Sequence, residues 1–394
     1  MKILSVNAGS SSLKFQVYEM PEEKVLMKGT FERIGIDGSF YTLKINGEKI
    51  KKEAPLHTHE DAVRLLLEEL VENHVVENLD EIKGVGHRVV HGGDKYAASV
   101  VIDDDVLKTV SELSDLAPLH NPANLMGIEA FMKAVPNALQ VACFDTAFHQ
   151  TLEEERYLYA VPTEWYKEYG VRKYGFHGMS HKYVSSRAAE FLDKKYCNII
   201  VCHLGNGGSV SAVRDGRCVD TSMGFTPNAG IVMGSRSGDI DYSMIPFLMK
   251  KTGKSIEEID TMLNKQSGML AISGISSDFR DIEAKISERD HDAILAHYAF
   301  VNSVLGYIAK YYVELGGVDA ICFTAGVGEN SPHVRRMIID RLSCLGLKLD
   351  RDKNEEMRLG KEGVITKEDS SVPCFVIPTD EEVMIARDTF ELLG

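Results

Sequence analysis

Two distant segments of the chain share one pattern: an apolar strand, a turn of small residues and a second strand of alternating polarity. The first is residues 3–17, with its turn at residues 7–12, and the second is residues 199–213, with its turn at residues 203–209. Each pattern predicts a β-hairpin, because Gly and Ser suit tight turns. The repeat indicates a duplicated domain. Since Gly and Ser occupy most hairpin turns, chance similarity is the alternative.

Helices and strands alternate between and after these hairpins. Thr58 and Asp61 form a capping-box pattern before a helix with apolar residues at helical spacing: Val63, Leu66, Leu67 and Leu70. A second helix is predicted over residues 292–315, ending at Gly316-Gly317, with an apolar strand at residues 318–323. Helix, short turn and buried strand in this order predict an α/β fold, and the hairpins make the sheets mixed.

Length and charge exclude several classes of protein. A chain of 394 residues exceeds the size at which one hydrophobic core stops growing, so two domains are expected, with a boundary near residues 148–163. The net charge of −15 disfavours binding to nucleic acid or an anionic membrane. The sequence has no long apolar span, and its strand-like start lacks the regions of a signal peptide, so we expect a cytoplasmic protein.

The seven cysteines show no Cys-x-x-Cys spacing, and Cys143, Cys202 and Cys322 lie in apolar runs. We therefore expect reduced core cysteines, with a zinc site or a catalytic thiol as the alternative.

Three glycine-rich turns follow predicted strands, at residues 7–12, 203–209 and 325–330. Glycine lets backbone N–H groups approach an anion, and consecutive N–H groups form a phosphate nest. The third turn leads to Ser331 as N-cap and Pro332 at the first helical position, so a phosphorylated ligand would meet a helix N-terminus. Each turn alone is equally consistent with a simple tight turn. Neither a Walker motif nor a kinase His-Arg-Asp loop is present.

Charged residues near other turns carry the remaining chemistry. Arg88 and Arg236 lie among glycines, where arginine suits bidentate recognition of carboxylate or phosphate, although surface loops also hold arginines. The loop residues His120 and His177 lack metal-ligand spacing and carry no catalytic assignment from spacing alone. Asp145 ends an apolar strand, where metal-binding or catalytic acids often occur, as do helix caps. In residues 378–382, Thr379 is a candidate helix cap and the carboxylates are candidate magnesium ligands.

Together these segments resemble the acetate kinase family over nearly the whole chain. Beside the segment containing Arg236, the matching stretches are residues 6–14, 86–93, 117–122, 144–149, 174–181, 203–207, 224–227, 278–280 and 326–330. This family belongs to the superfamily of acetate and sugar kinases, heat-shock chaperone ATPases and actin. The resemblance implies two duplicated ribonuclease-H-like (actin-like ATPase) domains, with mixed sheets flanked by helices and the nucleotide in the cleft between them. The implied domains are residues 1–148 with 383–394, and residues 149–382.

The resemblance also implies an activity. It is the reversible, Mg²⁺-dependent transfer of the γ-phosphoryl group of ATP to acetate, giving acetyl phosphate and ADP by direct in-line transfer. This reaction belongs to acetyl-CoA and acetate metabolism. Mn²⁺ is the alternative ion, and the family is homodimeric.

Roles carry over residue by residue. The implied catalytic groups are Arg88, Asp145, His177 and Arg236, and the implied metal residues are Asn7 and Glu381. The acid would bind at Arg88 among Val90, Leu119, His120, Phe176 and Pro227. ATP would contact Lys14, His203, Leu204, Gly205, Asn206, Gly207, Asp278, Phe279, Arg280, Gly326, Val327, Gly328, Glu329 and Asn330. Two departures are Asp380, where Asn is commoner, and Tyr242, where Pro commonly follows Asp241. The first would add negative charge near the metal.

A carboxylate nucleophile is already ionised at neutral pH, so it needs no general base. We therefore expect Asp145 to orient the metal shell or its water, while Arg88, Arg236, His177 and Mg²⁺ stabilise the transferring group. A propionate or other short-chain fatty acid kinase is the alternative, which Val90 disfavours because a smaller residue would open the pocket. From another class, a non-catalytic actin- or chaperone-like ATP-binding switch has no use for a carboxylate-binding arginine.

Overall fold

The computed structural model describes residues 1–118 and 120–394, so Leu119, expected in the acid pocket, lies outside the described residues. The chain forms two compact units: Met1–Gln150 with Asp380–Gly394, and Thr151–Thr379. The chain returns to the first unit at Asp380, three residues before the expected return at residue 383. The reason is local, since Asp380 is already the N-cap of the last helix, which packs on the first unit.

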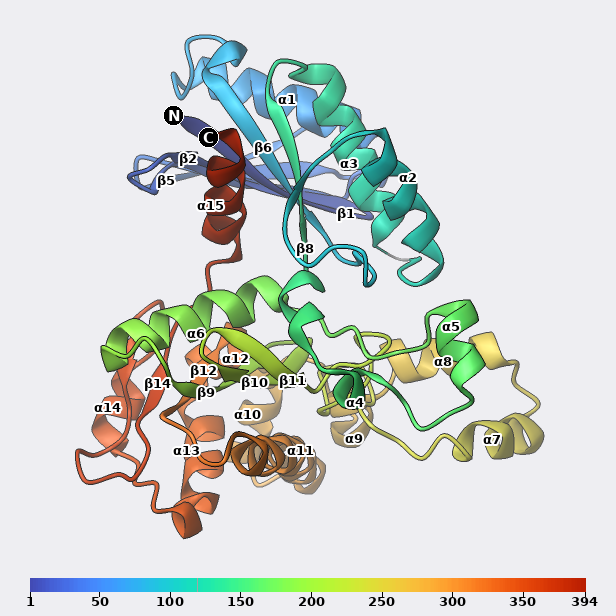
Figure 1. Cartoon of the computed structure of the whole chain (residues 1–394), viewed down its shortest axis with the longest axis vertical. Helices are drawn as coiled ribbons and strands as arrows, with labels where there is room; N and C mark the ends of the chain where they lie inside the picture. The colour runs from blue at the N-terminus through green and yellow to red at the C-terminus, as the bar shows by residue number, and fades with distance from the viewer. Residues whose placement is uncertain (119) are drawn as a thin grey trace. The chain divides into compact units, whose positions relative to one another are not determined.

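The first unit contains an eight-stranded sheet with the order β5-β4-β3-β2-β1-β6-β8-β7 (Figure 1). Strands β1 to β5 form an antiparallel meander, β1, β6 and β8 run parallel, and β7 pairs antiparallel with β8. The predicted first hairpin is confirmed by β1 and β2. The strands are β1 Lys2–Gly9, β2 Ser12–Glu19, β3 Lys24–Glu32, β4 Phe40–Ile45, β5 Glu48–Glu53, β6 Ile82–Val89, β7 Val100–Val101 and β8 Leu139–Phe144.

Helices cover both faces of this sheet. On one face, α1 and α3 enclose the main core with residues such as Leu66 and Phe131 against Leu4 and Val6. The predicted capping box of α1 is confirmed, with Thr58 as N-cap and Asp61 as its reciprocal partner. On the other face lies α15, which packs against β6, β1 and β8. The helices are α1 His59–Glu72, α2 Asp104–Glu112, α3 Asn121–Ala134 and α15 Glu381–Leu393.

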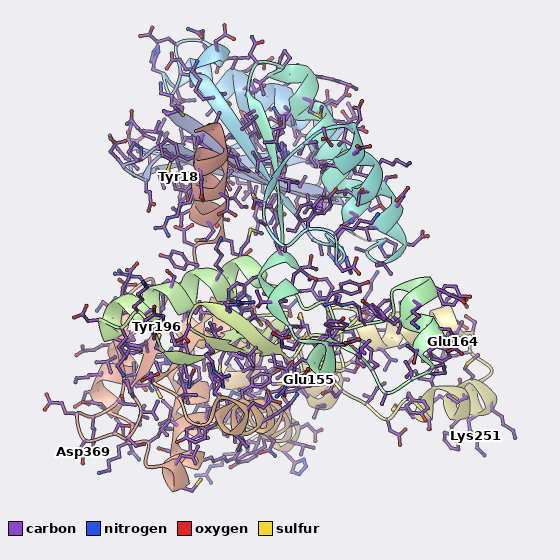
Figure 2. The ribbon with its side chains drawn as sticks, viewed as in Figure 1. Tyr18, Glu155, Glu164, Tyr196, Lys251 and Asp369 are labelled. Carbon is purple, nitrogen blue, oxygen red and sulfur yellow. The ribbon has the colours of Figure 1, made fainter. Side chains whose placement is uncertain are left out.

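Two glycines in β6 let α15 approach the sheet closely. A Cβ on Gly86 would lie 2.3 Å from Thr389 Oγ1 and 2.4 Å from Ile385 Cγ2, and one on Gly84 would lie 2.7 Å from Thr389 Cγ2. Alternate residues of a strand share a face, so Gly84, Gly86 and Arg88 point to the α15 side. The helix start is tied to the same sheet face by the Tyr18 hydroxyl, which donates to Asp380 Oδ1 at 3.3 Å (Figure 2).

The second unit has a six-stranded sheet with the order β11-β10-β9-β12-β14-β13. Its strands are β9 Asn198–Leu204, β10 Gly208–Arg214, β11 Arg217–Thr221, β12 Ala320–Thr324, β13 Gly363–Val364 and β14 Cys374–Val376. Helix α6 packs against β9 and β12, and α11 packs against β10 and β9. The helices are α4 Glu154–Tyr157, α5 Thr163–Tyr169, α6 Gly178–Leu192, α7 Met244–Thr252, α8 Ile256–Lys265, α9 Gly268–Ser273, α10 Phe279–Ser287, α11 His291–Leu315, α12 Ala325–Asn330, α13 Pro332–Arg341 and α14 Arg351–Glu356.

The second unit bears out two helix signals and corrects a third. The helix predicted to end at Gly316 is α11, and Ser331 caps α13 with Pro332 at its first position. The glycine-rich segment at residues 325–330, however, is the short helix α12 rather than a turn. The Glu329 carboxylate accepts the Ala325 N–H at 2.8 Å, and Ala325 takes a φ of 64°, so the chain enters a helical turn directly from β12.

The two sheets repeat one arrangement. In the first, β3-β2-β1 are antiparallel and β1, β6 and β8 parallel; in the second, β11-β10-β9 are antiparallel and β9, β12 and β14 parallel. In each sheet a short antiparallel strand follows the last parallel one. The α/β class with mixed sheets flanked by helices is therefore confirmed, and the repeated hairpins occupy equivalent places in the two sheets.

Other sequence expectations concern the core and membranes. Cys143, Cys202 and Cys322 are buried, and among the described residues no cysteine is in a disulfide. Within residues 1–118 and 120–394, no helix is long and apolar enough to cross a membrane.

We predict that Gly86→Ala destabilises the protein by about 1–3 kcal/mol, because the added methyl overlaps Ile385 and Thr389 and pushes α15 from the sheet. The shift of the urea midpoint in chemical denaturation measures this. The control is Gly306→Ala in α11, where an added Cβ meets nothing within 4 Å. There alanine should stabilise the helix, by up to about 1 kcal/mol. Equal midpoints for Gly86→Ala and the wild type would contradict the packing argument.

Candidate functional site

Arg88 ends β6 in an ion pair with the acid that follows β8. Its Nε donates to Asp145 Oδ1 at 2.9 Å and its Nη2 to Asp145 Oδ2 at 2.7 Å, and Nε lies 3.8 Å from Glu381 Oε2. Asp145 is 2% exposed, while the Arg88 side chain is 21% exposed. Burial alone would lower the pKa of Arg88, but the charges of Asp145 and Glu381 raise it. The cation is therefore permanent, and its fork is oriented by Asp145.

The loop after Arg88 is held by two asparagine side chains that no sequence pattern indicated. Asn124 on α3 accepts the Val90 N–H and donates to the Ala8 carbonyl, at 3.1 and 2.8 Å. Asn121 makes the same double contact with the backbone of His91. A side-chain amide that both donates and accepts can replace a missing strand neighbour. The segment 117–122 was recognised by resemblance, but this backbone clamp had no periodic or spacing signal.

Glu381, at the first position of α15, lies near the charges of Asp145 and Glu382. Its pKa is raised to about 7, mainly by burial; Arg88 opposes this rise, and the charges of Asp145 and Glu382 add to it. Asp380, rather than Thr379, caps α15, because its side chain accepts the Val383 N–H at 2.9 Å. Asn caps helices as well as Asp does, which explains why either residue suits position 380. Excess negative charge with oxygen donors suits a hard divalent cation.

The metal residues expected from the sequence are Asn7 on β1 and Glu381, both in the first unit. Asn7 pairs in register with Lys14 on β2, which puts both side chains on the α15 face of the sheet. Among residues 1–118 and 120–394, no three His, Cys, Asp or Glu side chains form a group that could hold a metal. Mg²⁺ sites in proteins often use only one or two carboxylates, together with substrate phosphates and water.

Two expected residues of the second unit meet at the start of α6. His177 takes a φ of 59° just before α6, and its Nδ1 lies 2.9 Å from Ser209 Oγ. Its ring stacks on that of His203, with centroids 4.1 Å apart. A left-handed conformation outside glycine costs free energy and often marks a functional position. The hydrogen bond to Ser209 and the stacking fix the direction of the ring.

Arg236 lies beside His177. A Cβ on Gly207 would be 3.4 Å from Arg236 Nη1 and 3.7 Å from His177 Nε2, so these three residues surround one point. Nη1 also donates to the Pro227 carbonyl at 3.1 Å. Burial lowers the pKa of Arg236, and no carboxylate among the described residues lies within 4 Å of it. A half-buried cation without a counter-ion is suited to bind an anionic ligand.

A pocket of about 670 Å³ lies within the second unit. It brings together residues from β9–β10, α10 and α12 that were expected to contact ATP: Gly205, Asn206, Asp278, Phe279, Arg280, Gly326, Val327 and Asn330. Asp278 caps α10 and pairs with Arg280, whereas Phe279 is buried against Phe300. The pocket also includes Ser331, the N-cap expected near a phosphorylated ligand, and three residues that the sequence did not indicate: Ser277, Glu283 and Leu359.

Other expected ATP contacts do not line this pocket. Glu329 turns inward, where its carboxylate accepts the N–H groups of Ala325 and Thr379, and burial raises its pKa. Gly328 is held through its carbonyl, which accepts from Arg335. Close in sequence to the lining residues Gly205 and Asn206, but not lining the pocket themselves, are His203, Leu204 and Gly207. Lys14 does not line it either and belongs to the first unit.

Arg335 on α13 is a positioning residue that the sequence analysis missed. It is fully buried and donates to the carbonyls of Gly328, Glu329, Asn354 and Met357 at 2.6–2.9 Å, and burial lowers its pKa to about 10. Its charge thus fixes the C-terminal half of α12 below the pocket. An arginine on a helix is usually exposed, so nothing in the sequence pattern distinguished it.

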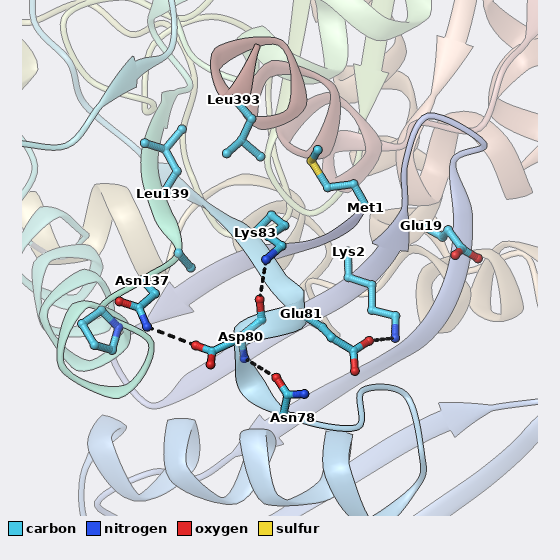
Figure 3. Close-up of a pocket in the computed structure, with 12 residues that line it drawn as sticks. Met1, Lys2, Glu19, Asn78, Asp80, Glu81, Lys83, Asn137, Leu139 and Leu393 are labelled. Atoms are coloured by element: carbon cyan, nitrogen blue, oxygen red, sulfur yellow. Dashed lines mark hydrogen bonds and ion pairs between the residues drawn. The ribbon is translucent and has the colours of Figure 1, made fainter.

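Another pocket, of about 1010 Å³, lies in the first unit, at the end of the sheet opposite to Arg88 and Asp145 (Figure 3). Its polar groups bond to one another: Lys2 forms an ion pair with Glu81, Lys83 donates to the Asp80 carbonyl, and Asn137 donates to the Asp80 carboxylate. It surrounds the starts of β1, β6 and β8, whereas ligands of α/β sheets bind at the carboxyl ends of strands. No residue expected in the site lines it.

Comparison with known proteins decides the family. The sequence model of the acetokinase family matches residues 2–387. The chain belongs to this family. An acetate kinase of Bacillus cytotoxicus is 54% identical over 393 residues, which are 99% of this chain and 98% of that protein. An acetate kinase of Macrococcus caseolyticus is 54% identical over 390 residues, 98% of each chain. The resemblance seen in the sequence is thereby confirmed.

Solved structures of related proteins extend the comparison to the fold. The crystal structure of Porphyromonas gingivalis acetate kinase has a TM-score of 0.95 at 44% identity and covers 100% of both chains. A propionate kinase from Francisella tularensis has a TM-score of 0.94 at 42% identity and covers 99% of both. The fold is therefore shared by relatives named for two different acids.

We predict that Gly326→Val weakens ATP binding at least about tenfold, because the side chain would fill the pocket. The free energy of unfolding should stay within about 0.5 kcal/mol, since a Cβ at Gly326 meets nothing within 4 Å. Calorimetric titration with ATP and denaturant unfolding measure the two effects. The control is Gly306→Val, an exposed helical glycine outside the pocket. Wild-type ATP affinity in Gly326→Val would exclude this pocket as the nucleotide site.

Proposed function

We propose that this member of the acetokinase family transfers the γ-phosphoryl group of ATP to acetate, reversibly and by direct in-line transfer, giving acetyl phosphate and ADP. One observation carries the proposal: the two arginines expected in the site differ in whether a carboxylate holds them. Arg88 is fixed by Asp145, while Arg236 lies beside His177 and Gly207 without a carboxylate partner in the described part of the chain. The guanidinium of Arg88 is thus held in one orientation by a carboxylate, whereas the charge of Arg236 is not balanced by one among the described residues.

The reaction joins two anions, so charge is its main obstacle. The acid has a pKa near ~4.3 and attacks as a carboxylate without a general base. In the transition state, charge spreads over the equatorial oxygens of the transferring phosphoryl group. In our proposal Arg236 and His177 stabilise this charge, because both are fixed before the substrates bind, by the Pro227 carbonyl and by Ser209.

Asp145 has a different role in this proposal from the one expected. Both of its oxygens accept from Arg88, so it acts first on the direction of that guanidinium. The exposed part of Arg88 would bind the acid's carboxylate. On the basis of family resemblance, Val90, His120, Phe176 and Pro227 remain the proposed acid-binding residues, and Lys14 remains a proposed ATP contact.

We propose Mg²⁺ as the cofactor, with Mn²⁺ as an alternative. Asn7 and Glu381 would hold it, and the raised pKa of Glu381 in a group of carboxylates supports this fit. When bound, the ion supplies positive charge to the β- and γ-phosphates of ATP. We also propose a homodimer, on the basis of family resemblance.

A propionate kinase is the second candidate, favoured by the Francisella tularensis structure. Val90 is half-buried beside Arg88, and its N–H is fixed by Asn124, so its side chain limits the length of the acid. One methylene in an apolar pocket changes discrimination by only about 1–3 kcal/mol. Acetate is the proposed substrate because valine leaves less room than a smaller residue.

We predict that Arg236→Ala lowers kcat by about 10²–10³-fold, because its interaction grows in the transition state. Arg88→Ala should instead raise KM for the acid by about 10–100-fold, since it removes a charge-assisted contact to the ground-state carboxylate. Steady-state kinetics with acetate and saturating MgATP measure both. Asp145→Asn is the matched test of orientation, and it should raise KM for the acid as Arg88→Ala does. If both arginine variants changed kcat alone, separate roles would be ruled out.

We predict the highest kcat/KM with acetate among acetate, propionate and butyrate, and a shift of about tenfold toward propionate in Val90→Ala. The acyl phosphate is trapped as a hydroxamate and quantified for each acid. A wild-type preference for propionate would keep the mechanism and change the substrate. ATP binding without product from any acid would favour a nucleotide-dependent switch protein.

A further inference from the structure

Part of the α15 face of the first unit's sheet carries a row of lysines. Leu13, Phe15 and Val17 of β2 face the core, so Lys14 and Gln16 face the other side with α15. In register, Gln16 pairs with Lys28, Lys28 with Lys44, and Lys44 with Lys49. Three exposed lysines from β3, β4 and β5 therefore stand directly side by side, beyond the strands that α15 covers.

This arrangement costs stability, because like charges directly opposite each other on a sheet repel. Among residues 1–118 and 120–394, no carboxylate lies within 4 Å of the ammonium groups of Lys14, Lys28, Lys44 or Lys49. The next lysine, Lys51, lies instead over the Phe40 ring at 3.9 Å. In the described part of the chain the four lysines are thus in no ion pair within 4 Å, although Glu32 and Glu382 lie at the same pocket and the net charge of the chain is −15.

The lysines surround a hollow rather than a flat surface. A pocket of about 320 Å³ is lined by all four, together with Gln16, Thr30, Thr42, Phe15, Gly29, Glu32 and Glu382. Thr30 and Thr42 are opposite each other in register; the Thr30 hydroxyl donates to Glu32, and Thr42 adds a second hydroxyl to the lining. The volume is at the lower end for small-molecule sites, so the ligand would be compact.

The charges define the ligand further. Neighbouring strands are about 4.8 Å apart, so Lys28, Lys44 and Lys49 span about 10 Å, more than one phosphate can contact. A long polyanion would meet the repulsion of the whole chain, whereas a short one feels mainly charges within a Debye length of about 8 Å. We propose that this pocket binds a compact anion with two or three phosphate groups. Its lining residues all belong to the first unit, whereas those of the pocket of about 670 Å³ all belong to the second, and Lys14 is the one lining residue that is also an expected ATP contact.

The test is calorimetric titration with inorganic tripolyphosphate, in metal-free buffer at constant ionic strength. One site is expected, with affinity at least about tenfold above that of inorganic phosphate, because only the longer anion reaches all three lysines. In Lys44→Gln/Lys49→Gln the affinity should fall at least about tenfold. Without ligand, this variant should melt at the wild-type temperature or above it, since the repulsion is relieved.

Two control variants separate this site from other sources of binding. Lys95→Gln/Lys108→Gln removes the same charge near Glu112 on the same unit and should bind tripolyphosphate like the wild type. Gly326→Val should do so too, and loss of binding there would assign the anion to the nucleotide pocket instead. Unchanged binding in Lys44→Gln/Lys49→Gln, equal losses in both lysine pairs, or no binding at all would overturn the proposal.

Discussion

The close contact between α15 and β6 governs the first unit. Gly84 and Gly86 have no side chains, so the helix backbone can lie directly on the strand. Arg88 is the next residue on that face, and Glu381 begins the helix, so this contact sets them 3.8 Å apart. A side chain at Gly84 or Gly86 would push α15 away from β6. Glu381 would then move away from Arg88. Packing and electrostatics are therefore one constraint here.

Three buried or half-buried arginines in this chain differ only in their partners. Arg88 meets a carboxylate in a bidentate pair, Arg335 meets four backbone carbonyls, and Arg236 meets one carbonyl and no carboxylate among the described residues. A paired cation is fixed, a cation surrounded by carbonyls is structural, and a cation with spare donors can still bind an anion. The same residue type thus orients, supports or binds according to its surroundings.

Local signals in the sequence predicted local structure well. The hairpin of β1 and β2, the capping box at Thr58 and the end of α11 at Gly316 follow from interactions between residues close in sequence. Family resemblance supplied the site residues that spacing left undecided. Neither source indicated Arg335 or the clamps by Asn121 and Asn124, because their partners depend on tertiary packing. The helix α12 was missed for a different reason: its contact from the Ala325 N–H to Glu329 is local, but the glycines of this segment favour a turn.

The order of the chain has a consequence for its synthesis. The chain leaves the first unit after Gln150 and returns at Asp380, so the whole second unit is translated before α15. Until then one face of β6 has no helix to cover Gly84 and Gly86, and Arg88 lacks Glu381. Domains generally fold as units as they emerge from the ribosome, the N-terminal one first. Here synthesis of the second unit is complete before that of the first, because the first unit still needs residues 380–394.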